Sequence, residues 1–434
     1  MLGAFVNAFK TPDLRRKLLF VLFIIVLFRL GSTMPAPGID VANVQACVKQ
    51  AASSDNAGLF ALINVFSGGA LLQLTVFALG IMPYITASII LQLLTVVIPR
   101  LESLKKEGQA GQTKITQYTR YLTLGLAILQ ATGIVALARS GGLFGGACNR
   151  PLMYDTDSIA QFLLIVVTMV AGTVMIMWFG ELITDRGIGN GMSLMIFTQI
   201  VATFPGSLWL IRQQQGWATF VIVVLIGLAV IAGVIFVEQA QRRIPVQYAR
   251  RMVGRRMFGG SSTYIPLKVN QAGVIPVIFA SSLMYLPALA AQFNSEAPWS
   301  AWVRDNLVQG SHPLYMVSFF ALIVFFTFFY VAITFNPEEV ADNMKKYGGF
   351  IPGIRAGKAT EDYLGYVLSR ITTPGALYLG LISLIPLVAF VLIQANQNFP
   401  FGGVTILIIV GVGLDTVKQI ESQLQQRNYE GFLR

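Results

Sequence analysis

Long apolar runs separated by polar segments recur along the whole chain. Eight of these runs are long enough to cross the hydrocarbon core of a bilayer, about 30 Å thick, as helices. They cover residues 18–34, 71–98, 118–138, 159–180, 217–237, 272–291, 314–335 and 373–393. The basic segment before the first run resembles a secretory signal, but no small-residue cleavage pattern follows it, so we interpret it as a permanent span. The pattern predicts an all-α polytopic membrane protein.

Two further apolar runs, 192–204 and 404–414, are shorter and are each preceded by glycine-rich segments. Such a run crosses a bilayer only by recruiting flanking polar or glycine-rich backbone, which persists at membrane depth where it lines water or is buried in protein. With these two runs, the sequence predicts ten transmembrane helices.

The chain divides near residues 205–216 into two sets of five spans. We therefore expect an N-terminal half, 1–210, and a C-terminal half, 211–434. Because five is an odd number, the second set starts on the opposite side of the membrane, and any likeness between the halves is an inverted repeat. Inverted halves commonly place a pathway at their interface, so we expect one here.

The charge is distributed unevenly between the two faces of the membrane. Most of the 31 lysines and arginines lie in the terminal segments and in the loops after the even-numbered spans. The formal net charge of +11 lies entirely on that face. By the positive-inside rule this face is cytoplasmic, which predicts that both termini are cytoplasmic.

Two long basic loops, 239–270 and 336–371, lie on this face. Loops of this length are commonly functional or disordered. Their charge is explained either by the topology rule together with contact to anionic lipids, or by docking of an acidic or nucleic-acid-bearing partner such as the ribosome.

The predicted spans carry almost no ionisable groups at membrane depth, where each costs several kcal/mol. With 55% hydrophobic and 12% charged residues, a single histidine and two cysteines, the chain offers no recognisable metal, phosphate or nucleophile motif. We expect no cofactor and no enzymatic activity, and we interpret His312 as a loop residue. Whether Cys47 and Cys148 are bonded stays open. The composition favours a passive path; an ion-coupled small-solute transporter is the alternative, and an intramembrane enzyme is a distant third.

The run 71–98 is unusual because Pro83, Thr86, Ser88 and Gln92 lie at membrane depth, which indicates a helix with one wet face. It follows a short apolar piece that ends at a glycine pair. That piece is either a half-helix that enters the membrane or a surface stub, and its residues alone do not distinguish the two.

Several motifs resemble the SecY family, the central subunits of bacterial protein-translocation channels. The resemblance covers essentially the whole chain and rests on Phe66-Ser67-Gly68-Gly69-Ala70, Ala78 to Ile85, Lys114 to Tyr121, Arg186 to Gly191, Pro266 to Pro276 and Phe350 to Arg355. It implies an hourglass pore between two five-helix halves in the plasma membrane. Such a channel conducts unfolded preproteins outward and releases hydrophobic segments into lipid through a lateral gate.

The resemblance also implies an aliphatic ring at the narrowest point of the pore. Carried across position by position, the ring consists of Ile81, Ile85, Met192, Ile196, Ile278 and Ile408. Met192 stands where many relatives carry isoleucine, and its flexible side chain leaves a seal feasible. An apolar constriction of this kind dewets and blocks ions, yet deforms around a passing polypeptide.

The same resemblance assigns residues 59–70 to a plug helix on the outer side of the ring, and it places the lateral gate between spans 2 and 3 and spans 7 and 8. The plug residues are Leu59, Phe60, Leu62, Ile63, Asn64, Val65, Phe66, Ser67, Gly68 and Gly69. For polar contacts across the gate we expect Gln92 and Asn270.

The basic loops match the family's docking surface for the SecA motor ATPase and the translating ribosome. The expected docking residues are Arg242, Arg243, Arg250, Arg251, Arg255, Arg256 and Arg355. The resemblance further implies small SecE-like and SecG-like partner subunits and the signal sequences of preproteins as the molecules recognised.

Overall fold

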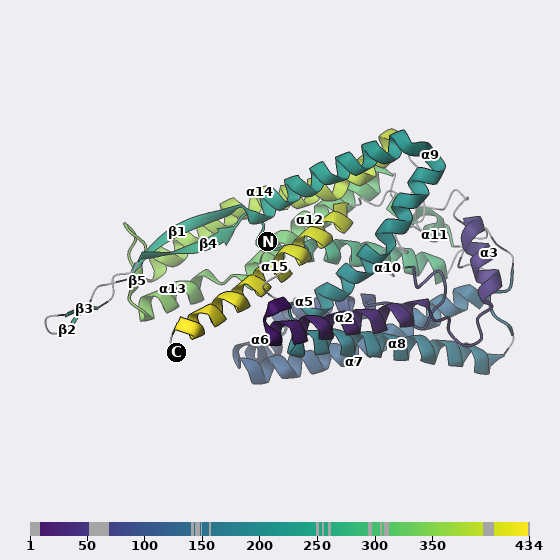
Figure 1. The fold of residues 1–434 in the computed structure, drawn as a ribbon, viewed down its shortest axis with the longest axis horizontal. Helices are drawn as coiled ribbons and strands as arrows, with labels where there is room; N and C mark the ends of the chain where they lie inside the picture. Colours follow the sequence, from purple (N-terminus) through teal and green to yellow (C-terminus); the bar gives the residue numbers. More distant parts are fainter. Residues whose placement is uncertain are drawn as a thin grey trace.

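The computed structural model is built almost entirely from helices (Figure 1). The residues that it describes are 9–51, 69–139, 143, 148, 150–155, 158–248, 251–253, 256–258, 262–293, 297–303, 306–307, 312–393 and 403–432. The helices are α2 (Pro12–Thr33), α3 (Val41–Ala51), α5 (Met82–Val97), α6 (Pro99–Lys106), α7 (Gln109–Arg139), α8 (Ile159–Arg186), α9 (Gly191–Gln239), α10 (Ile275–Phe293), α11 (Pro298–Val303), α12 (Pro313–Thr334), α13 (Pro337–Lys346), α14 (Lys358–Ile393) and α15 (Gly403–Phe432). The strands are β1 (Gln241–Tyr248), β2 (Arg251–Val253), β3 (Arg256–Phe258), β4 (Ser262–Lys268) and β5 (Gly349–Phe350).

The long helices form two packed groups. In the first, α5 packs on α7, α7 on α8, and α8 on α2 and the start of the chain's longest helix, α9. In the second, α10 packs on α12, α12 on α14, and α14 on α15. The groups meet where α15 packs against α9 and where α10 contacts α5 and α7. Each of the ten expected spans overlaps a helix, and the predicted all-α multi-pass architecture is confirmed.

Length and hydropathy alone identify fewer crossings. Within the described part of the chain, six helices or helix segments are long and apolar enough to cross a membrane, and a seventh is added if α5 and α6, bent by 100°, count as one. The other expected spans fall on α2, on α10 and on α15, which carries polar residues along its second half.

The prediction for the start of the second span was wrong. Residues 71–81 form successive turns, and the helix begins only at Met82. The turns are stabilised by the chain after α2, because Ala36 N–H donates to the Leu74 carbonyl at 3.0 Å and Val76 N–H to the Met34 carbonyl at 2.9 Å. These contacts satisfy backbone groups that a continuous helix would have paired internally, which a local pattern does not reveal.

The predicted end of the fifth span at Pro205 was also wrong, because α9 continues through this proline. A proline removes one helical hydrogen bond, whereas stopping the helix at membrane depth would leave several groups unpaired. The break comes at Gly216, with φ 82° and ψ −177°. The Arg212 guanidinium lies 4.4 Å from the Trp209 ring and 4.2 Å from the Trp217 ring, so its cation contacts aromatic rings on both sides of this break.

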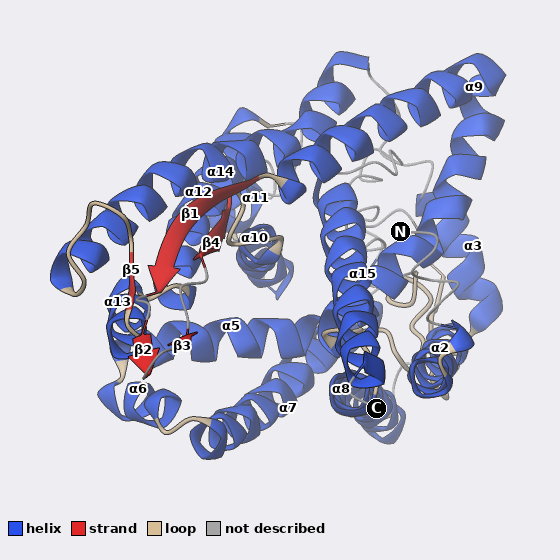
Figure 2. Cartoon of the chain, turned by 60° about the vertical axis from the view of Figure 1, so that its left-hand side comes forward, coloured by secondary structure: helices blue, strands red, loops and turns tan. Residues whose placement is uncertain are grey.

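The long loop after the sixth span contains β structure that the sequence analysis did not predict. β1 pairs with β4 in antiparallel register, and β5 adds to the free edge of β1, giving the order β4-β1-β5. Along β1 only Ile244 and Val246 are buried, at 2% and 1% exposed. Figure 2 shows this sheet beside α13 and α14. The short β2–β3 hairpin extends beyond the sheet (Figure 1).

The two ends of the molecule differ in character. Figure 1 shows β2, β3 and α13 at one end of the long axis and α3 at the other. On the side of the bundle that faces the end with β2, β3 and α13, Leu14 near the start of α2 packs with Ile188 and with Ile420 in the second half of α15. The first and last described helices therefore meet on the same side of the molecule.

Candidate pore and docking surface

The six residues expected to form the ring lie in or directly before four helices, and all six belong to one large apolar cluster. Ile81, Ile85, Ile196 and Ile408 are among its buried members, and Met192 and Ile278 are half-buried and pack against it. The most exposed of the four buried residues, Ile85, is 9% exposed. The six side chains thus lie in the apolar interior to which both halves of the chain contribute, and their assignment to a ring stays a prediction.

Helix starts position these side chains. Ile81 is the residue before α5, Ile278 lies in the first turn of α10, and Ile408 lies in the second turn of α15. The start of α9 is fixed by Asn190, whose Oδ1 accepts from the Met192 N–H at 3.0 Å. A side-chain cap satisfies helical N–H groups that would otherwise be unpaired. Five of the six expected ring residues thus lie in the first two turns of a helix, and Ile81 lies directly before one.

The two residues expected at the lateral gate each use their amide within their own half of the chain. Gln92 Nε2 donates to Ser88 Oγ at 3.4 Å, one turn earlier on α5. Asn270 Nδ2 donates to Glu238 Oε1 at 2.6 Å and to the Gly273 carbonyl at 3.1 Å. Among the described residues no hydrogen bond joins Gln92 to Asn270, although α5 and α10 are in contact. The assignment of both to the gate stays a prediction.

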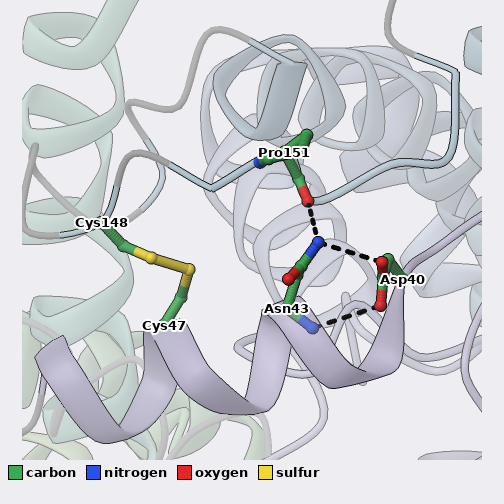
Figure 3. The surroundings of a disulfide bond; sticks show 5 residues. All are labelled: Asp40, Asn43, Cys47, Cys148 and Pro151. Carbon is green, nitrogen blue, oxygen red and sulfur yellow. Dashed lines mark hydrogen bonds between the residues drawn. A yellow bond between two sulfur atoms is a disulfide. The ribbon is translucent and has the colours of Figure 1, made fainter.

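The expected plug lies almost entirely outside the described residues. Residues 59–68 are not described, and Gly69 is the first described residue of the expected segment. Directly before this gap, α3 is tied to the loop that follows α7 (Figure 3). Asp40 Oδ1 accepts from the Ala42 N–H at 3.0 Å, and Asn43 Nδ2 donates to the Pro151 carbonyl at 3.0 Å.

Cys47 and Cys148 form a disulfide in the same place, across a sequence separation of 101 residues. Both residues are buried, at 0% and 4% exposed. This settles the pairing that the sequence left open. The disulfide and the hydrogen bonds of Figure 3 fix α3 against the loop at the end of the molecule opposite the basic loops.

Replacing Cys47 with serine should lower the thermal unfolding midpoint of the purified protein. In the chain-entropy model a disulfide that closes a loop of about 100 residues stabilises the fold by about 4.7 kcal/mol, and residual structure in the unfolded chain lowers that figure. Thermal unfolding in detergent, with and without dithiothreitol, measures the effect. The reductant should bring the unreplaced protein to the midpoint of the variant and leave the variant unchanged; a reductant-insensitive midpoint in both would contradict the pairing.

The two long basic loops fold as one unit, although they are far apart in sequence. Their shared apolar cluster buries Ile244 and Val246 of β1 and Leu267 of β4 together with Met344 of α13 and Ile351. β5 connects the loops further, because Phe350 pairs with Gln247 of β1. The sequence placed the loops near each other only as neighbours on one face, and the structure joins them into a single surface.

The expected docking arginines lie on this unit. Arg242, Arg243 and Arg355 are exposed, and the Arg243 guanidinium lies 4.9 Å from the Tyr264 ring. Arg251 and Arg256 belong to β2 and β3, and nothing is described of their side chains. The remaining two expected residues, Arg250 and Arg255, lie outside the described residues.

Two polar contacts escaped the sequence analysis. The Arg120 guanidinium makes two hydrogen bonds of 2.8 Å to the Glu181 carboxylate and so joins α7 to α8. Glu238, on the last turn of α9, accepts the Asn270 amide. Each of these two glutamates stands at the end of an apolar run, and that position was the sequence signal that could have pointed to a polar contact. His312, expected in a loop, caps α12 by accepting the Leu314 N–H at 3.2 Å.

Comparison with known proteins bears on what this arrangement does. The model of the SecY family matches residues 75–417. A protein translocase subunit SecY of Streptomyces galbus is 68% identical over 439 residues, covering 100% of both chains. The chain belongs to the SecY family. A SecY of Mycobacterium tuberculosis is 59% identical over 444 residues, again across 100% of both chains.

Solved structures share the SecY fold at low sequence identity. One described as "The structure of a protein conducting channel" is 18% identical, with a TM-score of 0.61 over 93% of this chain and 91% of that chain. Sec61 in a canine ribosome-channel complex is 16% identical, with a TM-score of 0.58 over 93% and 91%. Membership of the SecY family decides between the functions that composition left open, in favour of a protein-conducting channel over a small-solute transporter.

Proposed function

We propose that this chain forms the path through which a protein translocase moves unfolded preproteins across the plasma membrane and releases hydrophobic segments sideways into lipid. The observation that carries the proposal is that all six expected ring side chains, which come from both halves of the chain, lie in one uncharged apolar cluster. An uncharged constriction of this kind excludes water and ions when closed, and soft aliphatic side chains move aside for an extended polypeptide. The chain itself performs no chemistry in this mechanism.

The proposed orientation places both termini and the unit formed by the two basic loops in the cytoplasm. The positive charge of the docking loops supports this, as does the packing of Leu14 with Ile420 on one side. The disulfide supports it independently, because disulfides persist in oxidising compartments and are rare in the cytosol. Cys47 and Cys148 lie at the end opposite the docking loops, which is the outer end in this orientation.

The proposed partners follow from the same arrangement. The SecA motor or a translating ribosome docks on the exposed arginines of the basic unit and supplies the energy, while anionic lipids contact the surrounding basic face. Small SecE-like and SecG-like subunits complete the translocase. Gln92 and Asn270 serve the lateral gate, and residues 59–70 serve as the plug.

Crosslinking of a stalled secretory chain tests the path directly. A photoreactive side chain at Ile81 or at Ile278 should capture the stalled chain. The same group at Val167 of α8 or Leu381 of α14, which are 64% and 59% exposed on the outside of the bundle, should capture lipid instead. Equal capture at all four positions, or saturable ion-coupled solute uptake by vesicles that hold the protein, would contradict the proposal.

A further inference from the structure

The paired strands β1 and β4, here called the docking hairpin, are connected to the start of α10 by a continuous series of hydrogen bonds. The ladder between β1 and β4 is continuous over both strands. Immediately beyond the strands, the Val269 N–H donates to the Ala240 carbonyl at 3.0 Å. One step further, Asn270 Nδ2 donates to Glu238 Oε1 at 2.6 Å. The base of the hairpin is therefore closed by a side-chain bond between α9 and the segment that enters α10.

Asn270 also fixes the first turn of α10. Its Nδ2 makes a second bond, to the Gly273 carbonyl at 3.1 Å, and its side chain is only 2% exposed. The next residue, Val274, accepts the Ile278 N–H at 3.3 Å. Ile278 belongs to the proposed ring. Seven residues of chain thus separate Asn270, at the base of the hairpin, from Ile278.

Helix α14 also packs against the base of the docking hairpin. A Cβ atom at Gly375 of α14 would lie 2.5 Å from the Val269 carbonyl oxygen, so only glycine allows this approach. Close packing leaves the base of the hairpin little room to move independently of its neighbours. Helix α15 contacts the hairpin as well: Lys268 Nζ lies 3.5 Å from Oδ1 of Asp415, which follows Ile408 by seven residues.

We propose that Glu238 and Asn270 are positioning residues that transmit a displacement of the docking hairpin to α10 and so to Ile278 in the ring. The inference rests on the proposed function and adds how docking regulates the pore. A buried hydrogen bond from an amide to a carboxylate is stronger than the neighbouring backbone hydrogen bonds of the ladder. Asn270 Oδ1 is buried and has no partner in the described structure, so Nδ2 alone anchors this side chain. A load on the hairpin therefore moves the first turn of α10.

The test separates docking from pore opening in proteoliposomes that hold the complete translocase. Glu238→Ala removes the acceptor, and Gly375→Ala pushes on Val269 without touching the side-chain bond. Glu238→Ala should slow SecA-driven preprotein translocation by about tenfold, the factor expected when a hydrogen bond to a carboxylate is lost. Gly375→Ala should slow it as well, because the added Cβ displaces Val269 at the base of the hairpin. SecA binding should stay within about twofold of the unreplaced protein, because the arginine surface is untouched. Glu238→Gln, which keeps an acceptor, should recover most of the rate.

Each variant has a matched control. Gln239→Ala changes the exposed neighbour of Glu238, and Gly365→Ala adds a Cβ to the same helix where no atom lies within 4 Å. Both controls should translocate at the normal rate. Normal translocation rates in Glu238→Ala and Gly375→Ala would overturn the inference. A loss of SecA binding as large as the loss of translocation rate would also overturn it, because the bond would then only support docking. Failure of the unreplaced protein to conduct a preprotein would instead refute the proposed function.

Discussion

Replacing Ile408 with serine should raise the ion leak through the closed channel by about tenfold or more. Ile408 is 0% exposed within the cluster that holds the other five ring residues. The change removes an apolar side chain whose burial contributes about 2 kcal/mol and adds a hydroxyl that favours water in the constriction. A barrier lowered by about 1.4 kcal/mol passes ions about tenfold faster. Conductance of proteoliposomes without motor or preprotein measures the leak.

Ile420→Ser is the matched control for this experiment. Ile420 lies on the same helix and is 1% exposed, but it packs with Leu14 and Ile188 outside the ring. Its replacement should cost similar stability and leave the leak unchanged. We further expect Ile408→Ser to admit preproteins with defective signal sequences, because a loosened seal opens more readily. Equal leak from both variants would show that general destabilisation, rather than the ring, controls the conductance.

Reversing the charge of Arg355 should reduce motor-driven export by about 100-fold, because a lost charge-assisted hydrogen bond and the new repulsion together cost about 3 kcal/mol at a docking contact. Arg355 is exposed on the basic unit. Its backbone is fixed by the Thr360 hydroxyl, which donates to the Arg355 carbonyl at 2.9 Å, and by the nearby buried Ile351. The side chain is therefore presented from a rigid turn. ATP-driven translocation into inverted membrane vesicles measures the loss.

Two comparisons show whether the position or the charge matters. Lys10→Glu makes the same change in net charge at an exposed site in the other half and should translocate normally. Arg355→Lys keeps the charge but lacks the bidentate geometry of the guanidinium group. Its translocation rate should lie between the rates of Arg355→Glu and Lys10→Glu. The amount of inserted protein should match in all variants. Undiminished export by Arg355→Glu would remove Arg355 from the docking surface.

The spans were predictable because the membrane imposes a local rule. A segment at membrane depth must pair its own backbone groups and face lipid with apolar side chains, so each crossing leaves a run of the right length in the sequence. The rule failed where another part of the chain supplied the partners. Residues 71–81 pair with the chain after α2 and need no helix, and Pro205 is tolerated inside α9.

The ring was assigned through family resemblance, since an isoleucine that seals a pore has the same sequence pattern as one that packs a core. The docking hairpin was missed for a different reason. Its buried positions, Ile244 and Val246, alternate with exposed ones as in a strand, but Arg242, Arg243 and Pro245 dilute that signal within the basic loop.

The sequence by itself determined the class of the protein, the positions of most of its spans and the basic face, because each depends on residues that are neighbours along the chain. Only the tertiary structure decided which distant residues meet: Cys47 with Cys148, Arg120 with Glu181, and Glu238 with Asn270. These pairings depend on how helices pack against one another. Packing is set by the fit of many side chains at once, which no single stretch of sequence encodes.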